Sequence, residues 1–427
     1  MPASQLLSLA AARRQGHLVG ITSVCSAHPE VIAAALALGR AQGKAVLIEA
    51  TCNQVNHEGG YTGMRPADFR RFVERLAADE GFDLGGLILG GDHLGPNPWR
   101  ALPAAEAMAK AADMVAAYAA AGFKKIHLDA SMSCADDPSP LPDATIAARS
   151  ARLAAVAERH ASGEALVYVI GTEVPIPGGA LEEVAHLAVT SAAAAQATVD
   201  IHRAAFEREG IPRAFFRIVG LVVQPGVEFG NENVVAYIPA AARGLVAVLD
   251  TLPLVFEAHS TDYQTPEALS ALVRDGFAIL KVGPGLTFAL REALYGLDHI
   301  ADLLFPPRTE TLRAVTERVM LTAPKHWASY YPGTPAHQKL QRHFSYSDRI
   351  RYYWTEDAAA QAVSALLALF GNMSIPEPLI SQHLGAAYAD VMQGNVAPTA
   401  KALLRAAVTR VLTVYSAACG PLPPDQR

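Results

Sequence analysis

Acidic and imidazole side chains stand at the ends of several short apolar runs in this chain. The residues concerned are Glu49, Asp92, His93, Asp129, Glu173, Glu257 and His259. Moving an unpaired carboxylate out of water costs several kcal/mol or more. If these groups converge in the fold, they must therefore pair with one another, bind a metal ion, or do both.

His93 and His259 are the best candidates for metal ligands. A neutral imidazole suits Zn²⁺ and similar ions, and Glu173 would supply a third donor while leaving positions open for a substrate. No short motif such as H-E-x-x-H is present, so the ligands must come together from distant parts of the chain. We expect a divalent cation, most simply zinc. The plainer alternative is that His93 only donates a hydrogen bond to another ligand.

Asp92 is the first candidate for a general acid or base, because a strand end lets adjacent side chains splay into one pocket. Glu257 is the second, although it would equally well orient His259 or pair with Lys281. Lys281 allows two readings. It would form a Schiff base with a ketose carbonyl, or it would neutralise carboxylates, and the many nearby acids favour the ion pair.

A phosphate group would find donors in the Gly283-Pro284-Gly285 loop. Glycines before a helix expose backbone amides, and the loop after the eighth strand of a barrel often binds phosphate. Ser260 and the arginine-rich stretch Arg342–Arg351 would add further donors, although the loop is equally consistent with a plain turn. The remaining polar residues predicted to contact a substrate are Glu49, Asn53, Gln54, Asp129 and Gln224.

These residues need a parallel barrel to bring them together. Eight β-branched runs alternate with Ala-rich helical segments and start roughly 25 to 50 residues apart, the rhythm of βα units. The predicted strands are Leu18–Val24, Ala45–Thr51, Leu87–His93, Lys125–Ser131, Ala165–Glu173, Arg217–Gln224, Leu252–Ser260 and Ala278–Gly283. The pattern predicts an α/β fold, a (β/α)₈ TIM barrel. Neither G-x-G-x-x-G after the first strand nor a P-loop is present, which disfavours a Rossmann nucleotide site and a P-loop kinase.

The two-residue period of a strand sets which side chains point inward. It places His127, Asp129 and Ser131 on one face of the fourth strand and the apolar Ile126 and Leu128 on the other. The apolar set should face the helices, so the polar set faces the barrel interior. Active sites of such barrels lie at the carboxyl ends of the strands.

After Phe305 the pattern becomes helical. Predicted helices within the barrel region include Pro103–Ala121 and Ala180–Arg208, and those beyond it are Thr309–Leu321, Asp357–Phe370 and Pro398–Tyr415. An aromatic and basic stretch, Lys325–Trp354, lies between them. We predict a catalytic barrel domain over residues 1–305 and a helical extension over residues 306–427 that packs on the barrel.

Composition excludes several classes of protein. The 427 residues are 51% hydrophobic and 18% charged, which is enough apolar material for a large core. The net charge of −6 argues against a nucleic-acid partner. No run approaches the ~18 apolar residues that span a bilayer, and no signal segment precedes the first strand, so no membrane association is expected. Four widely spaced cysteines indicate a reducing cytoplasm.

Nine strings of residues resemble the Z-subunit family of tagatose-bisphosphate aldolase. They are Ser23–Pro29, Leu47–Thr51, Gly59–Met64, Gly90–Asn97, His127–Cys134, Ile170–Pro175, Val223–Phe229, Glu257–Gln264 and Lys281–Pro284. The resemblance runs from about Leu18 to Leu304, and the extension is similar more loosely. It implies a TIM barrel and a phosphorylated ketohexose as substrate.

The resemblance implies two possible roles. Some members of that family support a separate class II aldolase subunit without catalysing a reaction, and others are tagatose-6-phosphate 4-epimerases. A kinase label used for some members has no support here, because no phosphate loop for a nucleotide is visible. A homo-oligomer is compatible with either role.

The family is distantly similar to catalytic class II aldolases. Asp92-His93 resembles their proton-transferring aspartate and zinc-binding histidine, and His259 resembles another zinc ligand. Gln224 stands where a further histidine is expected, so Glu173, Asp129 or Gln224 would have to replace it.

This resemblance leads to a hypothesis for the epimerase reaction. C4 of a 2-ketose does not adjoin the carbonyl, so we expect retro-aldol cleavage of C3–C4 with Asp92 or Glu257 taking the hydroxyl proton. The metal would stabilise the enediolate, and the aldehyde would rotate before the bond re-forms.

Overall fold

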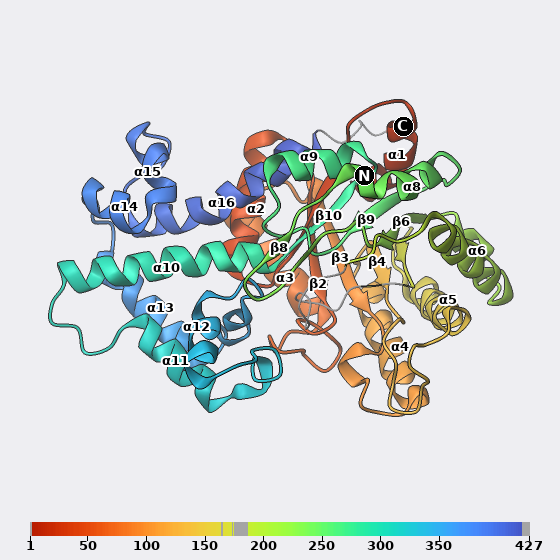
Figure 1. The fold of residues 1–427 in the computed structure, drawn as a ribbon, viewed down its shortest axis with the longest axis horizontal. Coiled ribbons are helices and arrows are strands. Elements are labelled where there is room, and N and C mark those ends of the chain that lie inside the picture. Colours follow the sequence, from red (N-terminus) through yellow and green to blue (C-terminus); the bar gives the residue numbers. More distant parts are fainter. Residues whose placement is uncertain (1, 164, 173, 175–186, 421–427) are drawn as a thin grey trace.

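Eight parallel strands close into a barrel in this computed structural model, which describes residues 2–163, 165–172, 174 and 187–420 (Figure 1). The strand order around the barrel is β1-β10-β9-β6-β5-β4-β3-β2. Their bounds are Ile21–Cys25 (β1), Val46–Thr51 (β2), Leu87–Leu94 (β3), Lys125–Leu128 (β4), Val167–Ile170 (β5), Ile218–Val223 (β6), Val255–Ala258 (β9) and Ile279–Val282 (β10). The predicted TIM barrel is confirmed.

The observed strands overlap the eight predicted runs and are shorter, except β3, which extends one residue further to Leu94. β4 ends at Leu128 and β9 at Ala258, while the prediction carried both strands on to Ser131 and Ser260. The ladder stops where polar side chains begin to turn into the barrel mouth. A short antiparallel pair, β7 (Glu228–Phe229) and β8 (Val234–Val235), was not predicted.

Helices connect the strands and cover the outside of the barrel. They are α2 (Pro29–Gln42), α3 (Pro66–Asp79), α4 (Ala104–Ala120), α5 (Asp143–His160), α6 (Ala192–Arg208), α7 (Pro212–Phe215), α8 (Pro239–Val246) and α9 (Pro266–Arg274). The helix predicted from Ala180 begins only at Ala192, because the Ser191 hydroxyl accepts a bond from the amide of Ala194 at 3.1 Å and caps it. Residues 180–186 of that prediction lie outside the described part.

The barrel interior is layered from apolar to charged. Near the amino ends of the strands, Leu47, Ile88, Val167, Val255 and Ile279 are buried in one apolar cluster with Leu6 and Leu9 of α1 (Pro2–Arg14), which closes that end. Toward the carboxyl ends the interior residues become Glu49, Lys125, Glu257 and Lys281, all buried. Along the strands, the inward-facing side chains therefore change from apolar at one end of the barrel to charged at the other.

The helix after the last barrel strand, α10 (Pro284–Leu304), runs away from the barrel and leads to the extension (Figure 1). The extension contains α11 (Leu312–Thr322), α12 (Pro335–Phe344), the 3₁₀ turn η5 (Arg349–Tyr353), α13 (Asp357–Phe370), α14 (Glu377–His383), α15 (Gly385–Met392) and α16 (Ala400–Cys419). The last helix returns to the barrel and packs against α2, α9, α10 and β1. Its Tyr415 hydroxyl donates to the carbonyl of Thr261 at 2.6 Å. By length and composition α16 alone among the described helices could cross a membrane, yet here it lies against the barrel.

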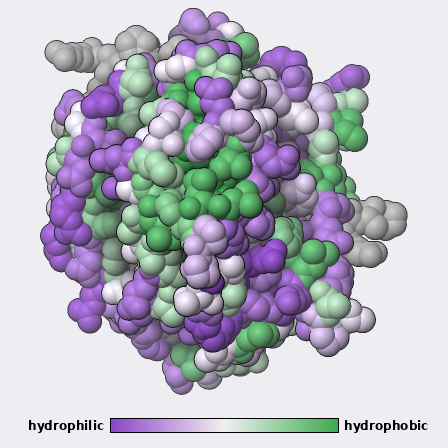
Figure 2. All heavy atoms as spheres, turned by 90° about the vertical axis from the view of Figure 1, so that its left-hand side faces the viewer, coloured by the Kyte–Doolittle hydropathy of each residue, from purple (hydrophilic) through white to green (hydrophobic). Residues whose placement is uncertain are grey.

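The end of the molecule formed by the extension carries an apolar patch. Figure 2 views this end and shows hydrophobic side chains gathered near its centre, bordered by hydrophilic ones. Large apolar side chains exposed on α10, α11 and α13 include Leu303, Leu321 and Leu369. The apolar patch therefore lies on the helices α10, α11 and α13 and not on the barrel.

Candidate active site

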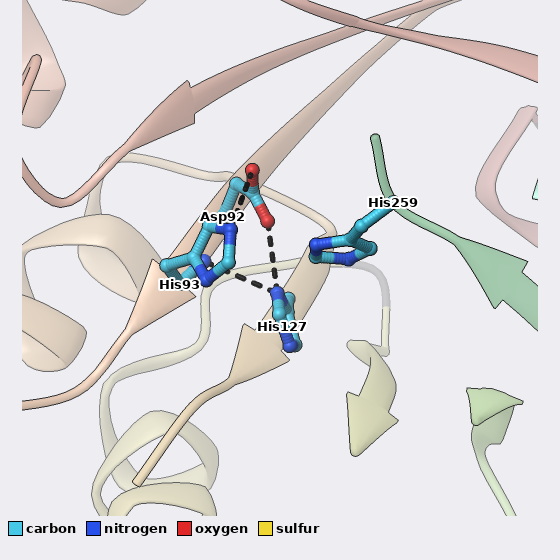
Figure 3. Close-up of side chains that lie close together, drawn as sticks. All are labelled: Asp92, His93, His127 and His259. Carbon is cyan, nitrogen blue, oxygen red and sulfur yellow. Dashed lines mark hydrogen bonds and ion pairs between the residues drawn. The ribbon is translucent and has the colours of Figure 1, made fainter. Parts of the chain in front are cut away.

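Three imidazoles and a carboxylate meet at the carboxyl ends of the strands. Asp92 and His93 leave β3, His127 lies on β4 and His259 follows β9, and one ligand atom from each lies within 4.8 Å of the others (Figure 3). The ring centroids are 4.9 Å apart for His93–His259, 5.1 Å for His93–His127 and 5.2 Å for His127–His259. All four side chains are buried.

A carboxylate orients each imidazole of this cluster. Asp129 Oδ2 lies 2.8 Å from His93 Nδ1, and Asp92 Oδ1 lies 2.8 Å from His127 Nδ1. Glu257 Oε1 lies 2.9 Å from His259 Nε2. Carboxylate–imidazole pairs of this kind fix the ring and the tautomer of metal-binding histidines.

The donor set fits a divalent ion such as zinc. His127 Nε2 is buried and has no hydrogen-bond partner among the described residues, which is an open ligand position. Burial lowers the pKa of His259 to about 3, so this imidazole is neutral, the form that binds metal. His93 and Ser260 also hold positive φ angles of 50° and 53°, a backbone conformation that non-glycine residues adopt rarely and often at functional sites.

Two glycines let the strands approach closely enough to build the cluster. A Cβ on Gly95 would stand 1.6 Å from the carbonyl oxygen of Asp129, so any other residue would push Asp129 away from His93. A Cβ on Gly90 would stand 2.8 Å from Cγ of Glu49. Both positions therefore require glycine.

Beneath the imidazoles lies a buried network of two lysines and three carboxylates. Lys125 Nζ is 2.6 Å from Glu49 and 2.7 Å from Glu257. Lys281 Nζ is 2.7 Å from Asp92 and 3.7 Å from Glu257, and it also pairs with Glu49. Although burial opposes its charge, these carboxylates raise the pKa of Lys281 well above its ordinary value. This arrangement favours the ion pair over a Schiff base, which needs an unprotonated amine.

The cluster opens into a pocket at the mouth of the barrel. Its lining residues are Cys25, Thr51, Asn53, Gln54, Tyr61, Asp92, His93, Phe229, His259, Ser260, Asp262, Lys281, Val282, Gly283, Pro284, Arg351 and Tyr352. The last two come from η5 in the extension. The extension therefore forms part of the pocket wall.

The predicted phosphate cradle is filled by a side chain of the protein itself. Asp262 Oδ1 accepts hydrogen bonds from the amides of Gly283 at 2.9 Å and Gly285 at 2.7 Å. Burial raises the pKa of Asp262 to about 6, and the two amides counteract that rise. The structure thus differs from the prediction, because the amides that would bind phosphate already have an acceptor.

Arg351 offers a cation in place of that cradle. Its guanidinium donates to the carbonyls of Ser347 and Asp348 and to the Tyr352 hydroxyl, the last at 3.1 Å. It forms no ion pair with any residue in the described ranges. A cation that lines a pocket without a carboxylate partner is well suited to an anionic ligand.

The other predicted residues take several places. Asn53, Gln54, Ser260 and Gly283 line the pocket, as do Asp92, His93, His259 and Lys281, while Glu49 and Glu257 lie beneath it and Asp129 stands behind His93. Gln224 accepts from the amides of Gly226 and Val227 and so closes its own turn. Glu173 lies outside the described residues.

The sequence analysis gave no individual role to four residues of the site, Tyr61, His127, Asp262 and Tyr352. Arg351 ends the stretch Arg342–Arg351, which was predicted to add donors for a phosphate. The strand period had placed His127 on the interior face, which was the available signal. Local sequence gave no equivalent signal for Tyr352, because the extension reaches the pocket only through tertiary packing.

Comparisons with known proteins agree with this architecture. Residues 6–420 match the family described as D-tagatose-1,6-bisphosphate aldolase subunit GatZ/KbaZ-like. A protein of Agrobacterium fabrum (strain C58) named D-tagatose 6-phosphate 4-epimerase is 56% identical over 420 residues, which are 97% of this chain and 98% of the relative. The crystal structure of a probable tagatose 6 phosphate kinase from Sinorhizobium meliloti 1021 is 60% identical and superposes with a TM-score of 0.88, covering 94% of this chain and all of that one.

Proposed function

The chain belongs to the D-tagatose-1,6-bisphosphate aldolase subunit GatZ/KbaZ-like family, and from that premise we propose that it is a metal-dependent 4-epimerase interconverting D-tagatose 6-phosphate and D-fructose 6-phosphate. The family match confirms the resemblance stated from the motifs, and it extends through the helical extension. The observation that carries the proposal is the cluster of Asp92, His93, His127 and His259, which opens into the pocket that Arg351 also lines. The Agrobacterium relative supports the choice of reaction.

The metal would be held by His93, His127 and His259, with the Asp92 carboxylate beside them. A bound divalent ion supplies Lewis-acid polarisation of ketose oxygens. Asp129 and Glu257 keep the imidazoles of His93 and His259 in orientation. Glu173 is not needed for this set, because His127 supplies the third imidazole.

Asp92 is the base that we assign to the C4 hydroxyl. Its Oδ1 lies 2.8 Å from His127 Nδ1 and 2.7 Å from Lys281 Nζ, and its Oδ2 lies 3.8 Å from His93 Nε2. Although burial opposes ionisation, His93, Lys281 and His127 hold the pKa of Asp92 well below its ordinary value. Asp92 is therefore a carboxylate ready to accept a proton.

Cleavage of C3–C4 gives a direct route to inversion. As Asp92 removes the O4 proton, O4 becomes an aldehyde oxygen and the C3–C4 electron pair passes to the dihydroxyacetone fragment. Rotation of the glyceraldehyde 3-phosphate fragment presents its other face, and re-formation of the bond inverts C4. Arg351 would hold the phosphate so that this fragment stays in the pocket.

The test is an assay of the isolated chain with tagatose 6-phosphate, before and after chelation and after divalent ions are restored. We expect conversion to fructose 6-phosphate, loss of activity with the chelator, and recovery with metal. Asp92→Asn should lower kcat by about 100-fold or more, measured with the metal at saturating concentration. A metal-loaded, folded chain that does not convert the sugar would refute the proposal.

The second candidate is a subunit that supports a class II aldolase, which the family description favours. Such a chain would be inactive alone and would raise the activity of a co-expressed aldolase. A kinase, the name given to the Sinorhizobium relative, is disfavoured because the sequence lacks a P-loop. The same assay with ATP would detect it as formation of a bisphosphate.

A reducing cytoplasm is the compartment that fits this function. The four cysteines are all free thiols, and Cys25 lines the pocket. Phosphorylated sugars are retained within cells by their charge, which agrees with such a location.

A further inference from the structure

Inversion of C4 by cleavage of C3–C4 requires proton transfer to and from O4 on two sides of the substrate, and one base does not reach both. Before cleavage, O4 points to one side of the substrate, and after rotation of the aldehyde the new O4 points to the other. A proton must therefore leave O4 on one side and return to O4 on the other side. Asp92, at the end of β3, lies on the barrel side of the pocket, so a group on the opposite side is needed for the other position of O4.

Tyr352 reaches the same pocket from outside the barrel. It belongs to η5 of the extension, whereas Asp92 belongs to a barrel strand. Its ring stacks on His326 with a centroid distance of 4.9 Å and an interplanar angle of 7°, and the edge-on Tyr61 ring lies 4.8 Å away. These contacts hold the ring of Tyr352 in a fixed position.

Two cations surround the phenol of Tyr352. Arg351 Nη2 donates to its hydroxyl at 3.1 Å, and the guanidinium carbons of Arg351 and Arg349 lie 4.5 Å and 5.0 Å from the ring centroid. Although burial disfavours the phenolate, these arginines outweigh burial and lower the pKa of Tyr352 below its ordinary value. The neighbouring Tyr61 behaves oppositely, because burial raises its pKa.

We propose that Tyr352 is the second acid–base residue of the epimerase, acting on O4 of the epimer that Asp92 does not reach. This inference rests on the proposed function. In one direction Asp92 takes the O4 proton, C3–C4 breaks, the aldehyde rotates, C3–C4 re-forms on the other face and Tyr352 gives its proton to the new O4. In the reverse direction the phenolate of Tyr352 takes that proton and Asp92 returns one. Solvent water restores both residues between turnovers, so protons and electrons balance.

The position of Arg351 agrees with this role. O4 and the 6-phosphate belong to the same three-carbon fragment, so the group that exchanges the O4 proton must lie near the cation that holds the phosphate. Arg351 and Tyr352 are adjacent in sequence, joined by a hydrogen bond, and both line the pocket. One short turn of the extension thus provides both functions.

The experiment compares Tyr352→Phe with Tyr353→Phe in the full-length, metal-loaded chain. Tyr353 lies in the same turn, but its hydroxyl bonds to the carbonyl of Ala323 and its side chain does not line the pocket. We expect Tyr352→Phe to lower kcat for epimerisation by about 100-fold or more, with KM changed by less than about threefold, and Tyr353→Phe to keep the parental kcat.

A partial reaction separates this role from a structural one. Tyr352→Phe should still release glyceraldehyde 3-phosphate, trapped by a coupling dehydrogenase, from one of the two ketose phosphates but not from the other. Asp92→Asn should show the opposite preference. The difference between the ultraviolet titration curves of the parent and of Tyr352→Phe should also reveal a phenol that ionises at a lower pH than an ordinary tyrosine.

Two results would reject the role of Tyr352 and leave the epimerase function intact, provided that the parent is active. The first is a folded Tyr352→Phe variant whose kcat lies within about threefold of the parent value. The second is that this variant cleaves both ketose phosphates or cleaves neither. An inactive parent would reject both proposals together.

Discussion

His127 links the charge network to the metal cluster at the scale of a single residue. Its Nδ1 bonds to Asp92, and its Nε2 is buried without a hydrogen-bond partner among the described residues. An imidazole held by one nitrogen and open at the other is the usual state of a metal ligand.

We therefore predict that His127→Ala lowers metal affinity by at least about tenfold, because one of three imidazole donors is lost. Elemental analysis after dialysis against a competing chelator measures the bound ion directly. The exposed His17→Ala variant should retain the parental metal content. Full metal occupancy in His127→Ala would show that the ion, if present, uses other residues.

Lys125 makes a second prediction at this scale, one about stability. The side chain is fully buried between Glu49 and Glu257, so Lys125→Met would leave two carboxylates with less neutralising charge. Breaking a buried ion pair from one side costs about 3–5 kcal/mol in free energy of unfolding. Urea unfolding should show a loss of this order, against less than about 1 kcal/mol for the exposed Lys339→Met. Similar midpoints for the two variants would contradict the charge network.

Much of the inner site was predictable residue by residue, from the two-residue period of the strands and from the freedom of side chains at strand ends. The period places His259 on the same face as Glu257. Asp92 and His93 are adjacent, and both reach the pocket only because the strand end lets them splay, with His93 at a φ of 50°. His127 was placed on the correct face but given no ligand role, because the third donor was expected later in the chain, at Glu173, Asp129 or Gln224. Strand direction fixes a face, whereas the meeting of three rings depends on how the whole barrel closes.

At the scale of elements, η5 carries the anion-binding prediction. Arg351→Met removes the pocket cation that lacks an ion-pair partner in the described ranges. KM for tagatose 6-phosphate should rise about tenfold or more, as expected for the loss of a charge-assisted contact that contributes about 1.5–3 kcal/mol. Weak binding of unphosphorylated tagatose, measured by calorimetry, should change less than about threefold. Arg318→Met, at an exposed pair on α11, is the matched control. Equal weakening for both sugars would place the phosphate elsewhere.

The β7–β8 hairpin predicts a pH dependence of stability. Burial raises the pKa of Glu228 to about 7, while its bond with the Phe229 amide at 3.0 Å counteracts the rise. The folded pKa therefore exceeds the unfolded value of 4.5, so the folded state holds the extra proton between these values. Stability is lost as pH rises through that interval, and the loss persists above pH 7.

Glu228→Gln removes this titration and keeps an acceptor for the amide. Its free energy of unfolding should match the parent near pH 4.5 and exceed it by about 1–3 kcal/mol above pH 7. Guanidinium unfolding at a series of pH values measures the difference. A constant difference across the series would mean that Glu228 titrates alike in both states.

The phosphate loop shows where element-level prediction fails. The sequence correctly placed Gly283 and Gly285 at the start of a helix after the last strand. It could not reveal that Asp262, which follows another strand, would occupy their amides, because that contact joins residues 21 and 23 positions apart. The backbone geometry of a turn depends on the local sequence, but the acceptor that bonds to its amides depends on the tertiary structure.

At the scale of the whole molecule, the extension completes the barrel as well as the pocket. α16 lies against α2, α9, α10 and β1, and buries Leu403, Leu404, Val408 and Leu412. Local periodicity predicted this helix within a few residues, but not that it returns to the barrel wall. The spacing of the eight predicted strands indicated the fold class. The packing position of α16 depends on contacts with residues nearly 400 positions earlier, which local periodicity does not show.

This packing argues that a chain ending at residue 305 will not fold into a stable barrel. Loss of α16 would expose the apolar faces of α2, α9 and α10, and such surface drives aggregation. We expect the truncated chain to be insoluble or to unfold without a cooperative transition, as judged by size-exclusion chromatography and thermal melting. In the full chain, Leu404→Ala should lower the free energy of unfolding by about 2–5 kcal/mol, whereas the exposed Lys401→Ala should change it by less than about 0.5 kcal/mol. A soluble, cooperatively melting 1–305 chain would show instead that the barrel is an independent unit and that α16 only adheres to it.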